Sequence, residues 1–179
     1  MEYGKTCRRA GTGETSVKVS AIIHDSIVDG PGLRSTVFFA GCPHHCVGCH
    51  NPNSWDESHG ISQSIDEIYE ELMGNTLTNV TFSGGEPLLQ IENLIVLAKR
   101  LKQEGKNIWC YTGYTWENLI VLYGEKFSEF CSVIDVLVDG PFILEKRNIS
   151  LLFKGSSNQR LIDCQQSILA KQLILYKQA

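Results

Sequence analysis

Short β-rich runs alternate with amphipathic helical segments along this sequence, and this order limits the possible folds more than any other feature. Strand alternating with helix is typical of a parallel sheet with right-handed crossover connections. The β-rich runs are bounded by glycine, proline, asparagine and serine, as strands usually are. The strand candidates are residues 17–23, 36–39, 80–82, 108–111, 133–138 and 151–153.

Three helices have recognisable ends. Ser64 followed by Glu67 forms a capping box that predicts a helix start. A second helix is predicted over residues 91–104, where apolar residues recur every three to four positions and Gly105 suits the C-terminal cap. Thr115 can cap a third helix.

Glycine-containing segments follow the predicted strands and should meet at one edge of the sheet. The carboxyl ends of parallel strands lie on the same side, where barrels and open α/β sheets place ligands. The chain has 179 residues, whereas a complete eightfold barrel takes about 200 or more. We therefore expect an α/β fold with a partial, open barrel of five to six mostly parallel strands. Residues 17–179 would form one domain, and residues 1–16 a flexible N-terminal extension.

Three cysteines lie within eight residues, at positions 42, 46 and 49, in the run GCPHHCVGCHNP. Three thiolates can bind three irons of a cubane iron–sulfur cluster and leave the fourth iron open to a substrate. The alternative is structural zinc, with His44, His45 or His50 as a fourth ligand. Structural zinc sites usually combine two separated pairs of ligands, and here all three cysteines share one loop. The spacing therefore favours a cluster.

The run Ser83-Gly84-Gly85-Glu86-Pro87 follows another predicted strand. Glycines allow a ligand to approach the backbone closely. Exposed carbonyls there can accept hydrogen bonds from an ammonium group, and Glu86 adds negative charge. Taken alone, a glycine-rich turn between a strand and a helix is common. Together with the cysteines, this run indicates a ligand site.

Both runs resemble the signatures of the radical S-adenosylmethionine (SAM) enzymes. Among the radical SAM enzymes, the resemblance is to the activating enzymes of glycyl-radical enzymes. Their N-terminal block is similar to the segment DGPGLRSTVFFAGCPHHCVGCHN of this chain. The resemblance is closest to the activating proteins of the anaerobic (class III) ribonucleoside-triphosphate reductases, and it covers about residues 20–160. The segments that favour this group are Val47-Gly48, IWCYTGY at 108–114, IDVLVDGPF at 134–142 and FKGSSNQ at 153–159.

The resemblance implies roles for particular residues. Cys42, Cys46 and Cys49 would bind a 4Fe-4S cluster, whose open iron would bind SAM. The residues expected to contact SAM are Gly48, Cys49 and His50 at the adenosyl part, Gly84, Gly85 and Glu86 at the methionine end, and Asp139 at the ribose. No acid–base residue is required, because the chemistry belongs to the cofactors.

The resemblance also implies an activity and partners. A one-electron donor, flavodoxin or ferredoxin, would reduce the cluster, and reductive cleavage of SAM would give a 5′-deoxyadenosyl radical. That radical would take a hydrogen atom from a glycine of the large reductase subunit and leave a glycyl radical. Two alternatives are activation of another glycyl-radical enzyme, such as pyruvate formate-lyase, and a non-catalytic zinc or iron–sulfur binding module.

Composition limits the partners and the compartment. With 20 acidic and 16 basic side chains the net charge is −4, which does not favour nucleic acid as a partner. No apolar stretch approaches the roughly 18 residues of a membrane helix, and the N-terminus lacks the apolar core of a secretory signal. We expect a cytoplasmic protein without a membrane partner. The four other cysteines are interpreted as small apolar residues or an exposed thiol: Cys7, Cys110, Cys131 and Cys164.

Overall fold

A computed structural model describes residues 16–177 and shows an open, seven-stranded sheet in the order β3-β1-β2-β4-β5-β6-β7. Its four central strands, β2, β4, β5 and β6, are parallel. β1 pairs antiparallel with β2 and β3, and β7 pairs antiparallel with β6. The strands are β1 (Ser16–Ser26), β2 (Arg34–Phe39), β3 (Ile61–Ser64), β4 (Asn79–Gly84), β5 (Ile108–Tyr111), β6 (Val136–Asp139) and β7 (Arg160–Asp163).

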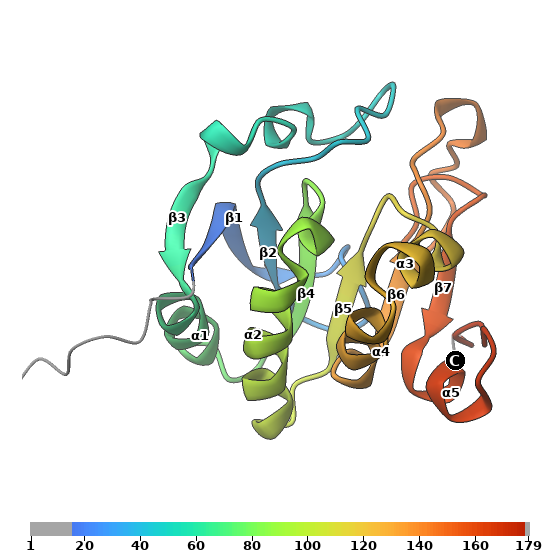
Figure 1. Cartoon of the computed structure of the whole chain (residues 1–179). Coiled ribbons are helices and arrows are strands. Elements are labelled where there is room, and N and C mark those ends of the chain that lie inside the picture. Colours follow the sequence, from blue (N-terminus) through green and yellow to red (C-terminus); the bar gives the residue numbers. More distant parts are fainter. Residues whose placement is uncertain (1–15, 178–179) are drawn as a thin grey trace, which may run out of the picture.

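Helices cover one face of this sheet (Figure 1). They are α1 (Ile65–Met73), α2 (Ile91–Gln103), α3 (Trp116–Tyr123), α4 (Glu125–Ser132) and α5 (Cys164–Ala170), with 3-10 turns at Pro52–Ser54, Glu57–His59, Pro87–Gln90 and Leu144–Lys146. The predicted capping box of Ser64 and Glu67 is confirmed. Thr115 caps α3, where Asn118 completes a second box. Gly105 follows the end of α2 with φ +74°, a conformation that glycine adopts without strain.

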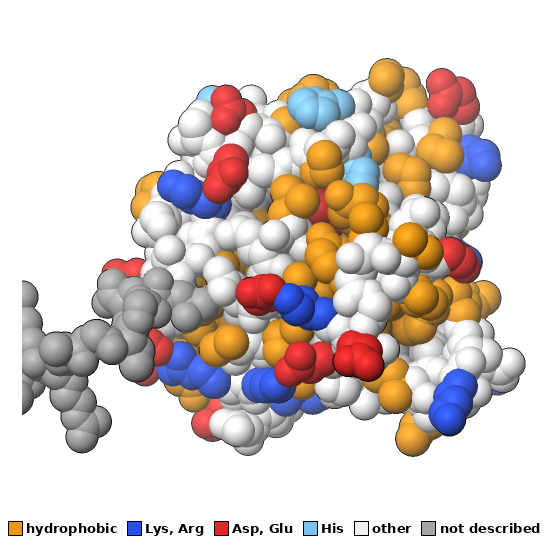
Figure 2. Space-filling model, in the orientation of Figure 1, with side chains coloured by type: hydrophobic (Ala, Val, Ile, Leu, Met, Phe, Trp, Pro, Cys, Tyr) orange, Lys and Arg blue, Asp and Glu red, His pale blue; other side chains and the backbone are white. Residues whose placement is uncertain are grey.

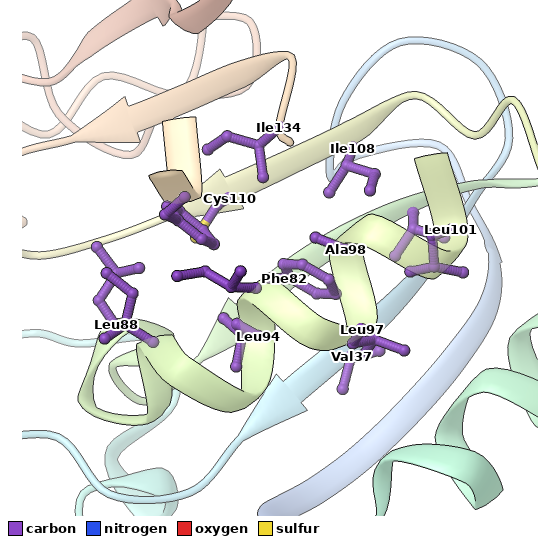
Figure 3. Close-up of a cluster of buried hydrophobic side chains, with 14 of the residues drawn as sticks. Val37, Phe82, Leu88, Leu94, Leu97, Ala98, Leu101, Ile108, Cys110 and Ile134 are labelled. Atoms are coloured by element: carbon purple, nitrogen blue, oxygen red, sulfur yellow. The ribbon is translucent and has the colours of Figure 1, made fainter. Parts of the chain in front are cut away.

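The main core lies between α2 and the central strands. Figure 3 shows side chains of β2, β4 and β5 packed beneath α2, with Phe82 among them. Phe82 also meets Phe39 edge to face, with ring centroids 5.8 Å apart. A smaller cluster fills the opposite face of the sheet around Trp109, which contacts the rings of Phe153 and Tyr176. The sheet is therefore covered on both sides near its centre.

The structure confirms the α/β class. The sheet is open, with β3 and β7 at its two edges, so the predicted partial barrel is not shown, and several details differ as well. Residues 16–177 contain seven strands instead of the predicted five to six, because the sequence did not reveal β3 and β7. The strand predicted at 151–153 is wrong: these residues form bends and turns, and Phe153 has φ +59°. Helix α4 was also not predicted. The proposed extension, apart from Ser16 in β1, lies outside the described residues, as does Cys7.

Charged and hydrophobic side chains are distributed unequally over the surface of the helices. Figure 2 shows charged side chains along the lower part of this face and hydrophobic side chains gathered towards its centre. The exposed apolar side chains of α3 are Ile120, Val121 and Leu122. Among residues 16–177, no helix combines the length and apolar character that a membrane span requires.

Candidate metal centre and ligand pocket

A cavity of about 240 Å³ opens at the edge of the sheet where the parallel strands end. Four glycine-containing segments reach this edge by following β2, β4, β5 and β6; they are the cysteine run and residues 83–87, 111–114 and 139–141. The fifth, residues 155–159, precedes β7; because β7 is antiparallel, its start lies at the same edge. The residues that line the cavity include Asp29, Cys42, Cys46, Cys49, Ser83, Gly84, Gly85, Tyr111, Thr112, Gly113, Phe142 and Gln159.

All three cysteines of the cluster motif are half-buried, carry free thiols and face this cavity. The Cys42 N–H donates to the Trp55 carbonyl at 3.0 Å, and the Asn51 N–H donates to Cys49 Sγ at 3.3 Å. Burial is the main cause that raises the pKa of the Cys42 thiol. Since iron binds the thiolate, cluster binding would have to displace that proton.

The donor set fits a cluster better than a single ion. Among residues 16–177, no three His, Cys, Asp or Glu side chains converge closely enough to bind one metal ion. A cubane cluster binds each thiolate at a different iron, so its cysteines need not converge on one point. The candidate zinc ligand His44 instead bonds Glu86, and His45 lies against the ring of Trp55.

The residues expected near the adenosyl part take different positions. Cys49 and His50 line the cavity, and the His50 ring lies 5.5 Å from that of Phe142, which forms another wall. Gly48 has φ +75°, and a Cβ there would come within 2.9 Å of Leu144. Gly48 therefore allows the cysteine loop to approach the segment after β6.

The glycine turn after β4 lies against the backbone of the cysteine loop. Gly84 has φ +102°, and a Cβ on it would come within 2.5 Å of the Phe39 nitrogen. A Cβ on Gly85 would come within 2.4 Å of the Gly41 carbonyl oxygen. Only glycine fits at either position. Ser83, Gly84 and Gly85 all face the cavity.

Glu86 and Asp139 are placed differently from these glycines. Glu86 is fully buried, and its carboxylate accepts hydrogen bonds from protein groups on every side. Asp139 is 1% exposed and accepts from the guanidinium of Arg160 and from the Trp116 N–H. Neither carboxylate is among the groups that line the cavity. Both connect the loops that form it.

Sequence analysis missed several cavity residues. Asp29 lines the cavity and accepts from Ser26 and Thr36, although no role was predicted for it. Thr112 and Trp55 were not singled out. For Asp29 the available signal was its place in the quoted N-terminal block. Nothing in the local pattern marked Trp55. Tyr111 lines the cavity, whereas the Tyr114 ring packs on His44.

Comparison with known proteins agrees with this site. A profile of the family described as "4Fe-4S single cluster domain" matches residues 28–162. Anaerobic ribonucleoside-triphosphate reductase-activating proteins match over 74–75% of this chain. That of Haemophilus influenzae is 38% identical over 144 residues and 89% of its own length. Those of Escherichia coli K12 and bacteriophage T4 are 35% and 33% identical, over 90% and 86% of their lengths.

A solved structure shows a similar fold. The crystal structure of QueE from Escherichia coli superposes with a TM-score of 0.50 at 18% identity, over 57% of this chain and 54% of that one. At this identity the similarity concerns the fold alone. The sequence comparisons establish the family: this chain belongs to the 4Fe-4S single cluster domain family and, within it, groups with the anaerobic ribonucleoside-triphosphate reductase-activating proteins.

Proposed function

We propose that this protein is a radical SAM activase that generates the glycyl radical of an anaerobic ribonucleoside-triphosphate reductase. The observation that carries the proposal is the position of Cys42, Cys46 and Cys49, which share one loop and face a cavity that is also lined by Gly84 and Gly85. The names of the relatives supply the reductase as the target. When bound, the 4Fe-4S cluster and SAM supply the electron and the radical that removes a hydrogen atom from a glycine of the reductase.

The residues of this chain hold and orient these groups. The three thiolates of Cys42, Cys46 and Cys49 would bind three irons of the cluster, which would leave the fourth iron open to a ligand. The backbone of Ser83–Gly85 borders the cavity without a Cβ at its two glycines, so a carbonyl oxygen can accept from a ligand ammonium group. His50 and Phe142 offer aromatic surface to a flat ring.

The cavity suits a substrate that is itself a protein segment. It opens at the edge of an unclosed sheet, so a loop of the reductase can enter between the cysteine loop and residues 140–159. A second cavity, of about 620 Å³, shares Phe38, His50, Asn51 and Gly84 with the first and widens the opening. We propose flavodoxin or ferredoxin as the electron donor, because the chemistry requires single electrons at low potential.

The test is an anaerobic EPR measurement of the reduced, reconstituted protein mixed with SAM and the reductase from the same genome. A glycyl-radical doublet is expected from the wild type and from Cys131→Ala, whose thiol is buried on α4 away from the cavity. Cys46→Ser is expected to lose the cluster, as measured by iron and acid-labile sulfide, and to give no doublet.

Two outcomes would contradict parts of the proposal. Zinc without acid-labile sulfide in the wild type would support the binding-module alternative and refute the cluster. Formation of 5′-deoxyadenosine without a doublet would keep the radical chemistry but refute this reductase as the target. A doublet on pyruvate formate-lyase in the same assay would then identify the other partner class.

A further inference from the structure

The Glu86 carboxylate lies fully buried between three of the loops that form the cavity. Its Oε1 accepts from the Leu88 N–H at 3.0 Å and from the Thr112 hydroxyl at 2.9 Å. Its Oε2 accepts from the Gly113 N–H at 2.8 Å and lies 2.8 Å from His44 Nε2. One carboxylate therefore joins the cysteine loop, the glycine turn and the segment after β5.

These bonds use the whole acceptor capacity of the carboxylate. Two carboxylate oxygens offer about four lone-pair sites, and four donors already occupy them. The Thr112 hydroxyl accepts from the Tyr114 N–H, so its own proton is directed to Glu86. An ammonium group in the cavity would find no free site on Glu86 unless one of these bonds broke.

His44 is the member of this network that belongs to the cysteine loop, between Cys42 and Cys46. Its side chain is 16% exposed. The Tyr114 ring packs against it edge to face, with centroids 4.4 Å apart. On another side lies Gly113, where a Cβ would come within 2.3 Å of His44 Cδ2. The His44 ring is therefore enclosed by the segment after β5.

We propose that His44 and Glu86 act together as positioning residues that fix the cysteine loop for cluster binding, and that Glu86 is not a ligand of SAM. This inference rests on the proposed cluster role of the three cysteines. The negative charge of the buried carboxylate is balanced by hydrogen-bond donors from protein groups. Gly84 and Gly85 then present only backbone atoms to the cofactor.

The first test compares two substitutions of similar polarity at His44. Glutamine can place its Nε2 close to the position of the histidine Nε2, whereas asparagine is one methylene too short. We expect His44→Gln to retain the bond to Glu86 and His44→Asn to lose it. The readout is backbone amide exchange of residues 42–49 in the reduced, metal-free protein, which is expected to be about tenfold faster in His44→Asn alone.

The same variants are then measured with the cluster bound. Iron release to a chelator is expected to be about tenfold faster in His44→Asn than in the wild type, with His44→Gln close to the wild type. Exchange in α2 serves as the control for a general loss of stability and should not change. Equal behaviour of the two variants, or faster exchange throughout the protein, would overturn the proposal.

Gly113→Ala perturbs the packing around the His44 ring without substituting a residue of the cysteine loop or Glu86. Gly113 has an ordinary backbone conformation, so the added methyl group conflicts mainly with the His44 ring. We expect Gly113→Ala to speed exchange of the loop in the wild-type background and to have little further effect when combined with His44→Ala. Additive effects in this double-mutant cycle would refute the coupling.

Glu86→Gln separates positioning from ligand binding. We expect Glu86→Gln to speed amide exchange of the cysteine loop in the metal-free protein. The glutamine NH₂ is a donor and would stand where a carboxylate oxygen now accepts hydrogen bonds. If loop exchange stays at the wild-type rate while the effect of SAM on the EPR spectrum of the reduced cluster disappears, Glu86 is a ligand and the proposal is wrong. A wild type that binds no cluster would instead refute the proposed function.

Discussion

Gly85→Ala is expected to destabilise the protein strongly, because the added methyl group meets backbone atoms that cannot rotate away. The ideal Cβ lies 2.4 Å from the Gly41 carbonyl oxygen and 2.9 Å from that of Ser54, whereas ordinary contacts begin at 3.4 Å. The Gly41 oxygen would have to move by the difference between 3.4 and 2.4 Å, about 1 Å.

That movement breaks a specific hydrogen bond. The Gly41 oxygen accepts from the Glu86 N–H at 2.7 Å, and a 1 Å shift would lengthen this contact beyond hydrogen-bond range. The neighbouring bond from the Gly41 N–H to Ser54, at 2.9 Å, is strained by the same shift. Weakening both hydrogen bonds, with one buried donor left unpaired, is expected to lower the free energy of unfolding by about 2–3 kcal/mol.

The assay is urea unfolding of the reduced, metal-free protein, because a bound cluster would add its own stabilisation. The corresponding decrease in melting temperature is about 5–10 °C for a chain of this length. Gly74→Ala is the matched control. Gly74 ends α1 with φ −60°, and a Cβ there would lie 3.2 Å from the Glu71 carbonyl oxygen and 3.6 Å from that of Glu70. A loss below about 0.5 kcal/mol for Gly85→Ala would refute the reasoning, because the loops would then be adaptable.

Two further predictions concern charged residues outside the cavity. Arg34 is fully buried, donates to Thr81 at 2.6 Å and to Val80 and Asn107 carbonyls, and burial lowers its pKa to about 10. Arg34→Lys leaves several acceptors unpaired and should cost about 2–3 kcal/mol in urea unfolding; a loss below 1 kcal/mol would contradict this. The hydrogen bond from Arg160 lowers the pKa of Glu117 to about 2. The ionised Glu117 therefore contributes its full stabilisation of the folded protein above the usual pKa of a glutamate, and this contribution is lost as the pH falls towards 2. Glu117→Gln should therefore be less stable by about 0.5 kcal/mol at pH 7, a solvent-screened value, with the difference shrinking between pH 5 and pH 3; a constant difference would refute the assignment.

Strong local signals made much of the fold predictable. The central parallel strands are short apolar runs, and β5 begins and ends at the predicted residues, 108 and 111. The helix caps at Ser64 and Thr115 depend on side chains next to the backbone groups they satisfy, so the sequence contains the whole interaction.

The elements that were missed depend on tertiary contacts. β3 has the sequence ISQS and is mostly exposed; it is a strand because it pairs with β1. β7 carries Arg160 and Asp163 at its ends and was not recognised as a strand, although it pairs with β6 over its full length. The apolar run 151–153 was predicted as a strand, but Phe153 instead packs its ring against Trp109 on one face of the sheet. Local hydrophobicity does not distinguish these two uses of an apolar residue.

The site shows the same division between local and tertiary information. The spacing of Cys42, Cys46 and Cys49 was evident in the sequence, because all three belong to one loop. The direction of the Glu86 side chain was not evident, because it depends on tertiary contacts. Its carboxylate caps the Leu88 N–H and is also bonded to groups of the cysteine loop and of the segment after β5. Two adjacent glycines border the cavity, and the next residue connects its walls. Consecutive residues of one motif therefore take different positions: Gly84 and Gly85 line the cavity, whereas the acceptor sites of the Glu86 carboxylate are occupied by donors of the protein.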